Sequence, residues 1–180
     1  MLFVDMRGYT AFAEEKPPEE VVGLLNRFYA VASRVLCKHD ALIDKLIGDE
    51  VMALFLTGLT GPRCCGKMVS AAASLLRGVG YGSSEGPWLP LGVGMDFGPA
   101  YVGNVGSGEV KDFTAIGDTV NTAARLQGEA KSGQIVLSER VYQEVAERYP
   151  DAQPVELELK GKSKPVPARV VEITPTAVQA

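Results

Sequence analysis

The sequence predicts a mixed α+β domain in which helices cover one face of a β-sheet. Two observations support this class. Apolar segments in the first half follow the order strand, helix, hairpin, helix, hairpin, and the 180 residues, 46% apolar and 22% charged, suffice for one hydrophobic core. The order βαββαβ is that of a ferredoxin-like two-layer sandwich, here with a C-terminal extension. We expect one domain over residues 1–173 and a flexible, frayed tail over residues 174–180.

The segments of the first half carry alternating signals for strand and helix. Strands are predicted where short apolar runs end at glycine turns, and helices where apolar residues recur every three or four positions. The predicted elements are a strand at residues 1–4, a helix from Glu19, a hairpin of residues 41–47 and 51–55, and a helix from Pro62 to the glycine-rich loop at 78–86. The Gly-Asp pair at the hairpin tip favours a tight turn.

The second half is richer in glycine. The predicted elements are a hairpin of residues 89–96 and 99–105, a polar connector at 106–112, a helix capped by Asp118 or Thr119, a strand at 135–137, a helix at 138–149 and two strands around residues 160–162. Glycines within the hairpin indicate places where the backbone closely approaches another backbone or a ligand.

Charge and composition exclude several classes of function. The net charge of −4, without a basic run, argues against a nucleic-acid partner. Uncharged stretches such as residues 51–62 are shorter than the roughly 20 apolar residues that span a bilayer, so we expect no membrane contact. Cys37, Cys64 and Cys65 match neither a zinc pattern nor a disulfide framework, which predicts reduced thiols and a cytoplasmic location.

Two acidic residues lie at strand ends, where their side chains can meet. Asp5 closes the first strand, and Asp49 occupies the tip of the first hairpin. If the strands are neighbours, these carboxylates and nearby carbonyls suit hard cations such as magnesium, and two such ions can bridge a phosphate. The alternative is that Asp49 only forms the turn and Asp5 only ends the strand.

Three further residues have side chains suited to a ligand. Asn121 and Arg125 are four positions apart and share a helix face beside small residues. An amide can orient a sugar oxygen and a guanidinium can stabilise phosphoryl charge, although the same pair also suits a solvated helix face. Lys45 lies among apolar residues and either extends to the surface or contacts a ligand.

Five segments resemble the successive motifs of class III nucleotidyl cyclase catalytic domains. They occur in the family's order and cover nearly the whole chain. The segments are residues 3–10 (FVDMRGYT), 44–50 (DKLIGDE), 102–106 (VGNVG), 113–125 (FTAIGDTVNTAAR) and 159–162 (LKGK). The resemblance implies the class III cyclase fold and the activity of an adenylate cyclase, which converts ATP to 3′,5′-cyclic AMP and pyrophosphate.

The resemblance also implies roles for individual residues. Two divalent cations, Mg²⁺ or Mn²⁺, would be held by Asp5, Asp49 and the carbonyl of Met6. The phosphate-binding residues would be Gly8, Tyr9, Thr10 and Lys160, the base-reading residues Lys45 and Thr114, and the catalytic residues Asn121 for the ribose and Arg125 for the α-phosphate. Lysine and threonine at the base-reading positions are typical of family members that use adenine.

The complete set of residue types in one chain implies a homodimer, because each active site of this family lies between two domains. The implied reaction is an in-line attack of the ribose 3′-oxygen on the α-phosphorus, with the two cations sharing the charge. Thr114 replaces an aspartate of many members and implies bicarbonate as an activator.

Three alternatives stay open on sequence alone. The first is a catalytically silent nucleotide-binding module, although such modules tend to lose a metal-binding or catalytic residue and this chain keeps them all. The second is a diguanylate cyclase, because residues 47–51 (IGDEV) resemble that family's hairpin motif, but this leaves Lys45, Asn121 and Arg125 unexplained. The third is a non-enzymatic scaffold, supported only by the acidic net charge.

Overall fold

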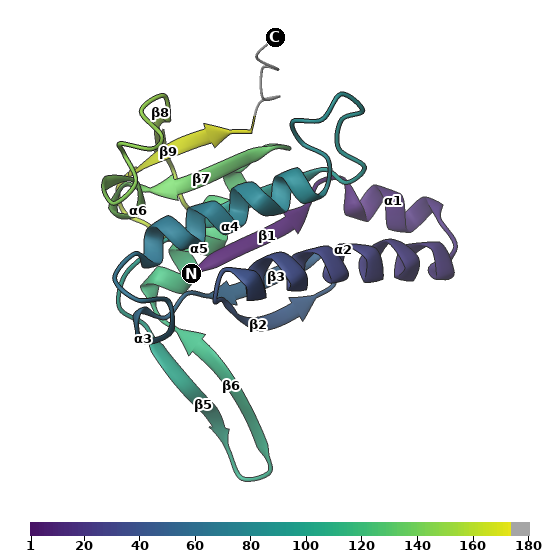
Figure 1. Cartoon of the computed structure of the whole chain (residues 1–180). Coiled ribbons are helices and arrows are strands. Elements are labelled where there is room, and N and C mark those ends of the chain that lie inside the picture. Colours follow the sequence, from purple (N-terminus) through teal and green to yellow (C-terminus); the bar gives the residue numbers. More distant parts are fainter. Residues whose placement is uncertain (174–180) are drawn as a thin grey trace.

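A computed structural model describes residues 1–173 of the chain as a seven-stranded sheet, a two-stranded sheet and six helices (Figure 1). The strands are β1 (Leu2–Met6), β2 (Leu42–Ile47), β3 (Glu50–Leu54), β4 (Leu91–Met95), β5 (Tyr101–Ser107), β6 (Val110–Ile116), β7 (Gln134–Ser138), β8 (Gln153–Leu157) and β9 (Val166–Glu172). The helices are α1 (Tyr9–Glu15), α2 (Pro18–Lys38), α3 (Thr57–Thr60), α4 (Cys64–Gly78), α5 (Asp118–Glu129) and α6 (Glu139–Gln143).

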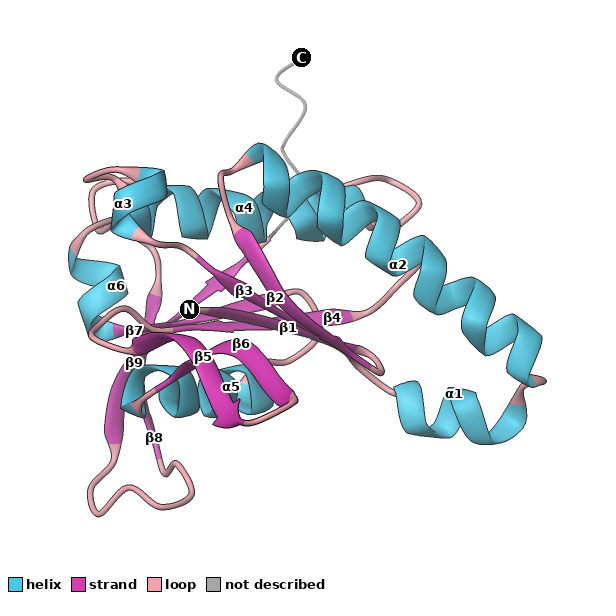
Figure 2. Cartoon of the chain, turned by 90° about the horizontal axis from the view of Figure 1, so that it is seen from below, coloured by secondary structure: helices cyan, strands magenta, loops and turns pink. Residues whose placement is uncertain are grey.

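The expected α+β fold is confirmed in the first half of the chain. The large sheet has the strand order β2-β3-β1-β4-β7-β9-β8, and its first four strands with α2 and α4 form the βαββαβ unit. Both helices lie on the same face of these strands (Figure 2). Leu2 and Val4 of β1 pack there with Phe28 of α2 and Leu75 of α4, all four fully buried. Burying each such side chain contributes about 1.5–3 kcal/mol.

Helix α5 covers the opposite face of the same strands, so the complete domain has helices on both faces rather than on one (Figure 2). Phe3 alternates with Leu2 and Val4 along β1 and packs with Ala123 of α5. The contact is close because β4 carries glycine here. A Cβ at Gly94 would lie 1.9 Å from the backbone nitrogen of Gln127, so the close backbone approach expected at the glycines is confirmed at this position.

The remaining strands differ from the sequence prediction in their pairing. β4 does not form a hairpin with residues 99–105 but pairs with β1 and, in parallel, with β7. β5 pairs instead with β6, and the expected polar connector at 106–112 forms the end of β5, the turn and the start of β6. This second hairpin extends away from the body of the domain (Figure 1). The prediction was wrong because a polar, glycine-containing stretch does not show the alternation typical of a half-buried strand.

Two predicted helix boundaries also change, and one helix near the N-terminus was missed. The N-cap of α5 is Gly117, and neither Asp118 nor Thr119 makes a capping bond; the Thr119 hydroxyl donates to the Pro99 carbonyl at 2.9 Å. The helix expected at residues 138–149 ends at Gln143 and continues as turns. The early helix α1 was not predicted. The expected tail at 174–180 lies outside the described residues.

The three cysteines differ in their exposure. Cys37, Cys64 and Cys65 are free thiols, as expected. Cys64 and Cys65 are buried at the start of α4, where burial raises the pKa of Cys65 to about 12, so this thiol is unreactive at neutral pH.

Across residues 1–173 no helix has both the length and the apolar character of a bilayer-crossing segment.

Candidate active site

The two carboxylates that the sequence singled out meet at one end of the central strands. Asp5 lies near the end of β1, and Asp49 lies in the turn between β2 and β3, beside β1. The backbone N–H of Met6 donates to the Asp49 carbonyl at 3.3 Å. Gly48 adopts a φ of 57°, which favours glycine, and its carbonyl accepts a hydrogen bond from the Tyr29 hydroxyl of α2. The turn is therefore held against β1 by both backbone and side-chain contacts.

The electrostatics of this pair fit a divalent cation. Burial, and then the adjacent Asp49 carboxylate, raise the pKa of Asp5 to about 7, while Gln127 and Arg7 act in the opposite direction. The Oδ1 atom of Asp5 is buried without a hydrogen-bond partner. Two close carboxylates with an unpartnered oxygen form a donor set suited to Mg²⁺ or Mn²⁺. No cluster of three or more His, Cys, Asp or Glu side chains suited to a metal occurs within residues 1–173, so carbonyl, water or substrate oxygens would complete the coordination.

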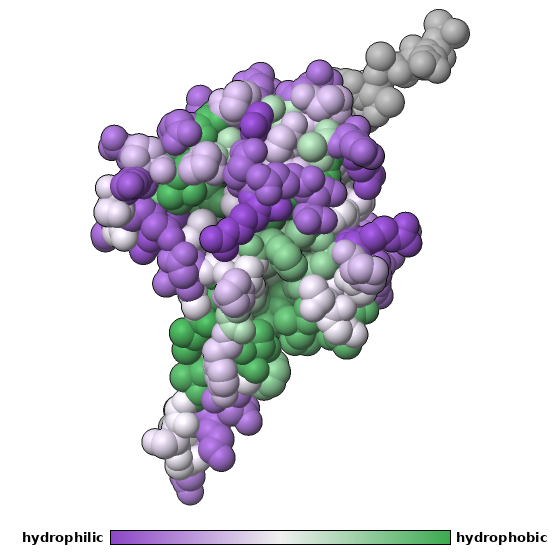
Figure 3. Space-filling view, turned by 90° about the vertical axis from the view of Figure 1, so that its left-hand side faces the viewer, coloured by the Kyte–Doolittle hydropathy of each residue, from purple (hydrophilic) through white to green (hydrophobic). Residues whose placement is uncertain are grey.

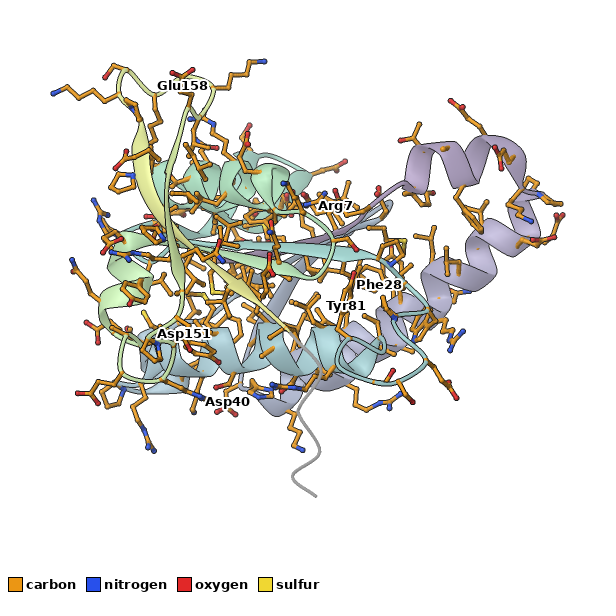
Figure 4. All side chains as sticks on the ribbon, turned by 90° about the horizontal axis from the view of Figure 1, so that it is seen from above. Arg7, Phe28, Asp40, Tyr81, Asp151 and Glu158 are labelled. Atoms are coloured by element: carbon orange, nitrogen blue, oxygen red, sulfur yellow. The ribbon has the colours of Figure 1, made fainter. Side chains whose placement is uncertain are left out.

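Arg7 joins the carboxylate pair to α5, a contact that the sequence analysis missed. Its guanidinium donates to Asp5 Oδ2 at 3.2 Å and to the Ala130 carbonyl at 2.9 Å, and it also donates to the Gln127 carbonyl. Figure 4 shows Arg7 beside this helix. The two carbonyls belong to the C-terminus of α5, where a cation is favourable. A Cβ at Gly92 would lie 2.3 Å from the guanidinium, so glycine at this position makes room for Arg7.

The phosphate-binding turn proposed from the sequence is the beginning of α1. Gly8 is the N-cap with a φ of 80°, and Tyr9 and Thr10 are the first two helical residues. Backbone N–H groups in the first turn of a helix have no partner within the helix, and they favour anions. These amides follow Asp5 by only a few residues along the chain.

The two base-reading candidates lie side by side on β2 and β6. The Lys45 ammonium contacts Asp112 of β6 and lies 3.9 Å from Asp44 Oδ2. The Thr114 hydroxyl donates to the same Asp44 oxygen at 2.8 Å. Lys45 is partly exposed and contacts the exposed carboxylate of Asp112, which raises the pKa of Lys45. The sequence analysis identified Lys45 and Thr114 as candidates but not Asp44, whose carboxylate lies near both side chains.

Asn121 and Arg125 lie one turn apart on α5, as predicted. Asn121 is exposed and Arg125 half-buried. A Cβ at Gly161 would lie 3.2 Å from the Arg125 guanidinium, so the Lys160–Gly161 turn lies against this arginine. The turn is also held by Lys162, whose ammonium donates to both oxygens of Asp118 at the start of α5. The structure thus brings Arg125 and Lys160 into one region.

The candidate residues form two groups within a single chain. One contains the carboxylate pair and the start of α1. The other contains the candidate base-reading residues on β2 and β6 with the candidate residues of α5 and the Lys160 turn, since β6 and α5 pack in one apolar cluster. Throughout residues 1–173, no hydrogen bond or ion pair joins Asp5 or Asp49 directly to Lys45, Thr114, Asn121 or Arg125.

Comparison with known proteins identifies the family. The sequence model of the protein family "Adenylate and Guanylate cyclase catalytic domain" matches residues 1–169. This chain belongs to that family. The cyclase domain shares 34% identity over 135 residues with an adenylate cyclase of Anabaena cylindrica, covering 73% of this chain and 27% of that protein. An uncharacterized protein of Mycobacterium tuberculosis is 35% identical over 133 residues, covering 73% of this chain and 24% of the relative. The chain therefore spans about a quarter of the length of these relatives.

Solved structures of the family support the fold. The adenylyl cyclase CyaB from P. aeruginosa superposes with a TM-score of 0.80 at 29% identity, covering 95% of this chain and 92% of that one. The guanylyl cyclase Cya2 superposes with a TM-score of 0.82 at 26% identity, covering 99% and 93%. The class III cyclase fold is thus confirmed, and family membership excludes the diguanylate cyclase alternative. Both nucleotide specificities occur among proteins with this fold.

Proposed function

We propose that this cyclase domain is an adenylate cyclase, which converts ATP to 3′,5′-cyclic AMP and pyrophosphate. The observation that supports adenine is the adjacency of Lys45 and Thr114 on β2 and β6. An ammonium can donate to the N1 acceptor of adenine, and a hydroxyl oxygen can accept from its 6-amino group. Guanine presents the opposite pattern, with an N–H at position 1 and a carbonyl oxygen at position 6. At position 1 the Lys45 ammonium and guanine would therefore face each other as two donors.

The chemistry divides between the two groups of residues. The 3′-oxygen forms a bond to the α-phosphorus, the bond from that phosphorus to the bridging oxygen of pyrophosphate breaks, and the hydroxyl proton passes to solvent. Divalent cations held by Asp5, Asp49 and the Met6 carbonyl would lower the pKa of the hydroxyl and share the phosphate charge. Asn121 would orient the ribose, and Arg125 would stabilise the charge that develops on the α-phosphate.

The remaining phosphate contacts would come from both groups. Free amides of Gly8, Tyr9 and Thr10 at the start of α1 suit the phosphate oxygens near the metals. Lys160 would reach the terminal phosphates from the opposite side, because its turn lies against Arg125. This arrangement supplies position and charge rather than a side-chain base, as in other phosphoryl-transfer sites.

A homodimer would complete each site. Among residues 1–173 no hydrogen bond or ion pair joins Asp5 or Asp49 directly to Lys45, Thr114, Asn121 or Arg125, and a two-fold axis would place the carboxylates of one copy opposite the α5 residues of the other. Exposed apolar side chains support such an interface. Tyr101, Phe113 and Ile116 on the β5–β6 hairpin and Ile47 on β2 are all more than half exposed. Figure 3 shows apolar atoms at the base of this hairpin. A surface of this kind marks an interaction site.

The decisive test measures cyclic nucleotide formation from ATP and from GTP by the wild type and by Asp49→Ala. We expect cyclic AMP with Mn²⁺ or Mg²⁺, none with EDTA, and at least a hundredfold loss in the variant. Cyclic GMP as the main product would reject adenylate specificity, and no product from either nucleotide would support the silent-module alternative.

Mixing two inactive variants tests the shared site. Asp49→Ala keeps the α5 group and Arg125→Ala keeps the metal group, so a mixed dimer has one intact site. Random pairing would restore about a quarter of wild-type activity, since half of the dimers are mixed and each has one of two sites. Failure to restore activity, with both variants shown to exchange subunits, would reject the homodimeric site.

Two further expectations accompany this proposal. Bicarbonate activation, implied by Thr114, stays a prediction that the same assay tests by adding bicarbonate at constant pH. A cytoplasmic location is supported by the three free thiols.

A further inference from the structure

Asp44 is a buried charged residue for which the proposed mechanism has no role. Its side chain is 1% exposed, one of its oxygens accepts the Thr114 hydroxyl at 2.8 Å, and its other oxygen is buried without a partner. Burying a carboxylate is unfavourable unless both of its oxygens are paired or hydrogen-bonded. The partly unsatisfied Asp44 carboxylate therefore calls for an explanation. The nearest cation is Lys45, at 3.9 Å from the oxygen that Thr114 contacts.

An irregularity in β2 places Asp44 in this position. The register with β3 shifts between Ile43 and Lys45, so Asp44 is the extra residue of a β-bulge. In a regular strand, consecutive side chains point to opposite faces, and Asp44 could not act on the same neighbour as Lys45. Here both reach β6, Lys45 at Asp112 and Asp44 at Thr114. Bulges next to functional sites often redirect a side chain in this way.

The hydrogen bond fixes what the Thr114 hydroxyl can offer a ligand. A hydroxyl has one hydrogen to donate, and a carboxylate can only accept. Because Thr114 donates its hydrogen to Asp44, the threonine oxygen presents only lone pairs to the nucleotide. It can therefore accept from the 6-amino group of adenine, whereas it meets the O6 of guanine with two acceptors facing each other. Without Asp44 the same hydroxyl could rotate and donate to O6.

We infer that Asp44 is a positioning residue for base selection, which makes Thr114 an obligate hydrogen-bond acceptor and so favours ATP over GTP. The inference rests on the proposed function, because it takes Thr114 as a base-reading residue. It extends that function by assigning the preference to a pair of residues rather than to the threonine alone. Threonine by itself suits either base.

The test compares the ATP:GTP preference of variants at Asp44. Asp44→Ala removes the acceptor, and we expect the ratio of kcat/KM for ATP to that for GTP to fall about tenfold, mainly through improved use of GTP. Asp44→Asn keeps an acceptor oxygen for Thr114 and should retain most of the preference. The ratio is measured on one protein sample, so partial unfolding of a variant affects both substrates equally and cancels.

Two controls distinguish positioning from a general effect of charge or fold. Asp112→Ala removes the other carboxylate near Lys45 without touching Thr114 and should leave the ratio unchanged. In a Thr114→Val background, Asp44→Ala should no longer change the ratio, because there is no hydroxyl to orient. An unchanged ratio in Asp44→Ala, an equal loss in Asp44→Asn, or the same shift in the valine background would each overturn the inference.

The same variants are measured in equilibrium competition of ATP and GTP against a fluorescent ATP analogue. This readout separates the two proposals. A wild type that prefers ATP in binding but forms no cyclic AMP rejects the proposed reaction, while the response of the binding ratio to Asp44→Ala still decides the present inference. A wild type that binds GTP in preference to ATP refutes both.

Discussion

Replacing Asp5 by asparagine should make the protein more stable without metal. Asp5 has a pKa of about 7 in the folded protein against its ordinary value of 3.8, first because of burial and then because of the adjacent Asp49 carboxylate. At pH 8 the Asp5 carboxylate is therefore charged in an unfavourable environment. The Asp5→Asn substitution keeps the size of the side chain and removes one charge, so the free energy of unfolding should rise.

The expected gain follows from the size of the pKa difference. The difference between 3.8 and about 7 corresponds to about 4 kcal/mol at pH 8, and it already includes the opposing effect of Arg7. The Asp5 side chain is 23% exposed, and screening by solvent reduces this value, so we expect a gain of about 2 kcal/mol for Asp5→Asn in EDTA.

The sign of the pH dependence is specific. Because the pKa of Asp5 is higher in the folded than in the unfolded state, the folded protein binds more protons between pH 4 and 7. Wild-type stability without metal should therefore fall as the pH rises through this window, stay low above pH 7, and equal that of the variant near pH 4. Mn²⁺ should stabilise the wild type at pH 8 and have little effect on the variant.

Urea unfolding followed by the fluorescence of Trp88, the single tryptophan, measures these free energies. Asp151→Asn, a change at an exposed turn, is the matched control and should be neutral. The reasoning is refuted if Asp5→Asn is no more stable than the wild type in EDTA at pH 8, or if its gain is the same at pH 4.

Three other predictions concern catalysis, packing and thiol reactivity. Arg125→Ala should lower kcat by a hundredfold or more, about 3–4 kcal/mol, with the melting temperature nearly unchanged; an unaltered kcat would remove this residue from the mechanism. Gly94→Ala should destabilise the fold by about 3 kcal/mol in urea, because its methyl group would meet the Gln127 backbone, and a neutral result would contradict the close packing of α5. Iodoacetamide should modify exposed Cys37 before buried Cys65, as read by peptide mass spectrometry; the reverse order would contradict the raised pKa of Cys65.

The parts of the site that depend on neighbouring strands could be predicted from sequence. Asp5 and Asp49 meet because a strand end and a hairpin tip are brought together whenever their strands pair, and the apolar pattern identified both strands. Asn121 and Arg125 share a face because the spacing of a helix requires it. These relations are local or follow directly from element order.

Long-range contacts could not be predicted in this way. β6 was missed, so Thr114 could be assigned a role only by resemblance and not by position beside Lys45. The contacts of Arg7 are made largely to backbone carbonyls of α5, and backbone acceptors have no signature in the sequence. The position of α5 on the opposite face of the sheet could not be predicted either. Phe3 and Val4 point to opposite faces of β1, but both are apolar, so the sequence does not indicate which helix covers which face.

The way α5 is attached has a consequence for how the proposed catalytic residues Asn121 and Arg125 can move. The helix backbone lies directly on Gly94, and its C-terminal carbonyls are held by Arg7. It therefore cannot slide or tilt over β4 without losing contacts at both places. In the proposed dimer, closure around a nucleotide would be a rigid-body rotation of one subunit against the other. A regulatory signal would then act by changing the angle between subunits, and it would not need to deform either one.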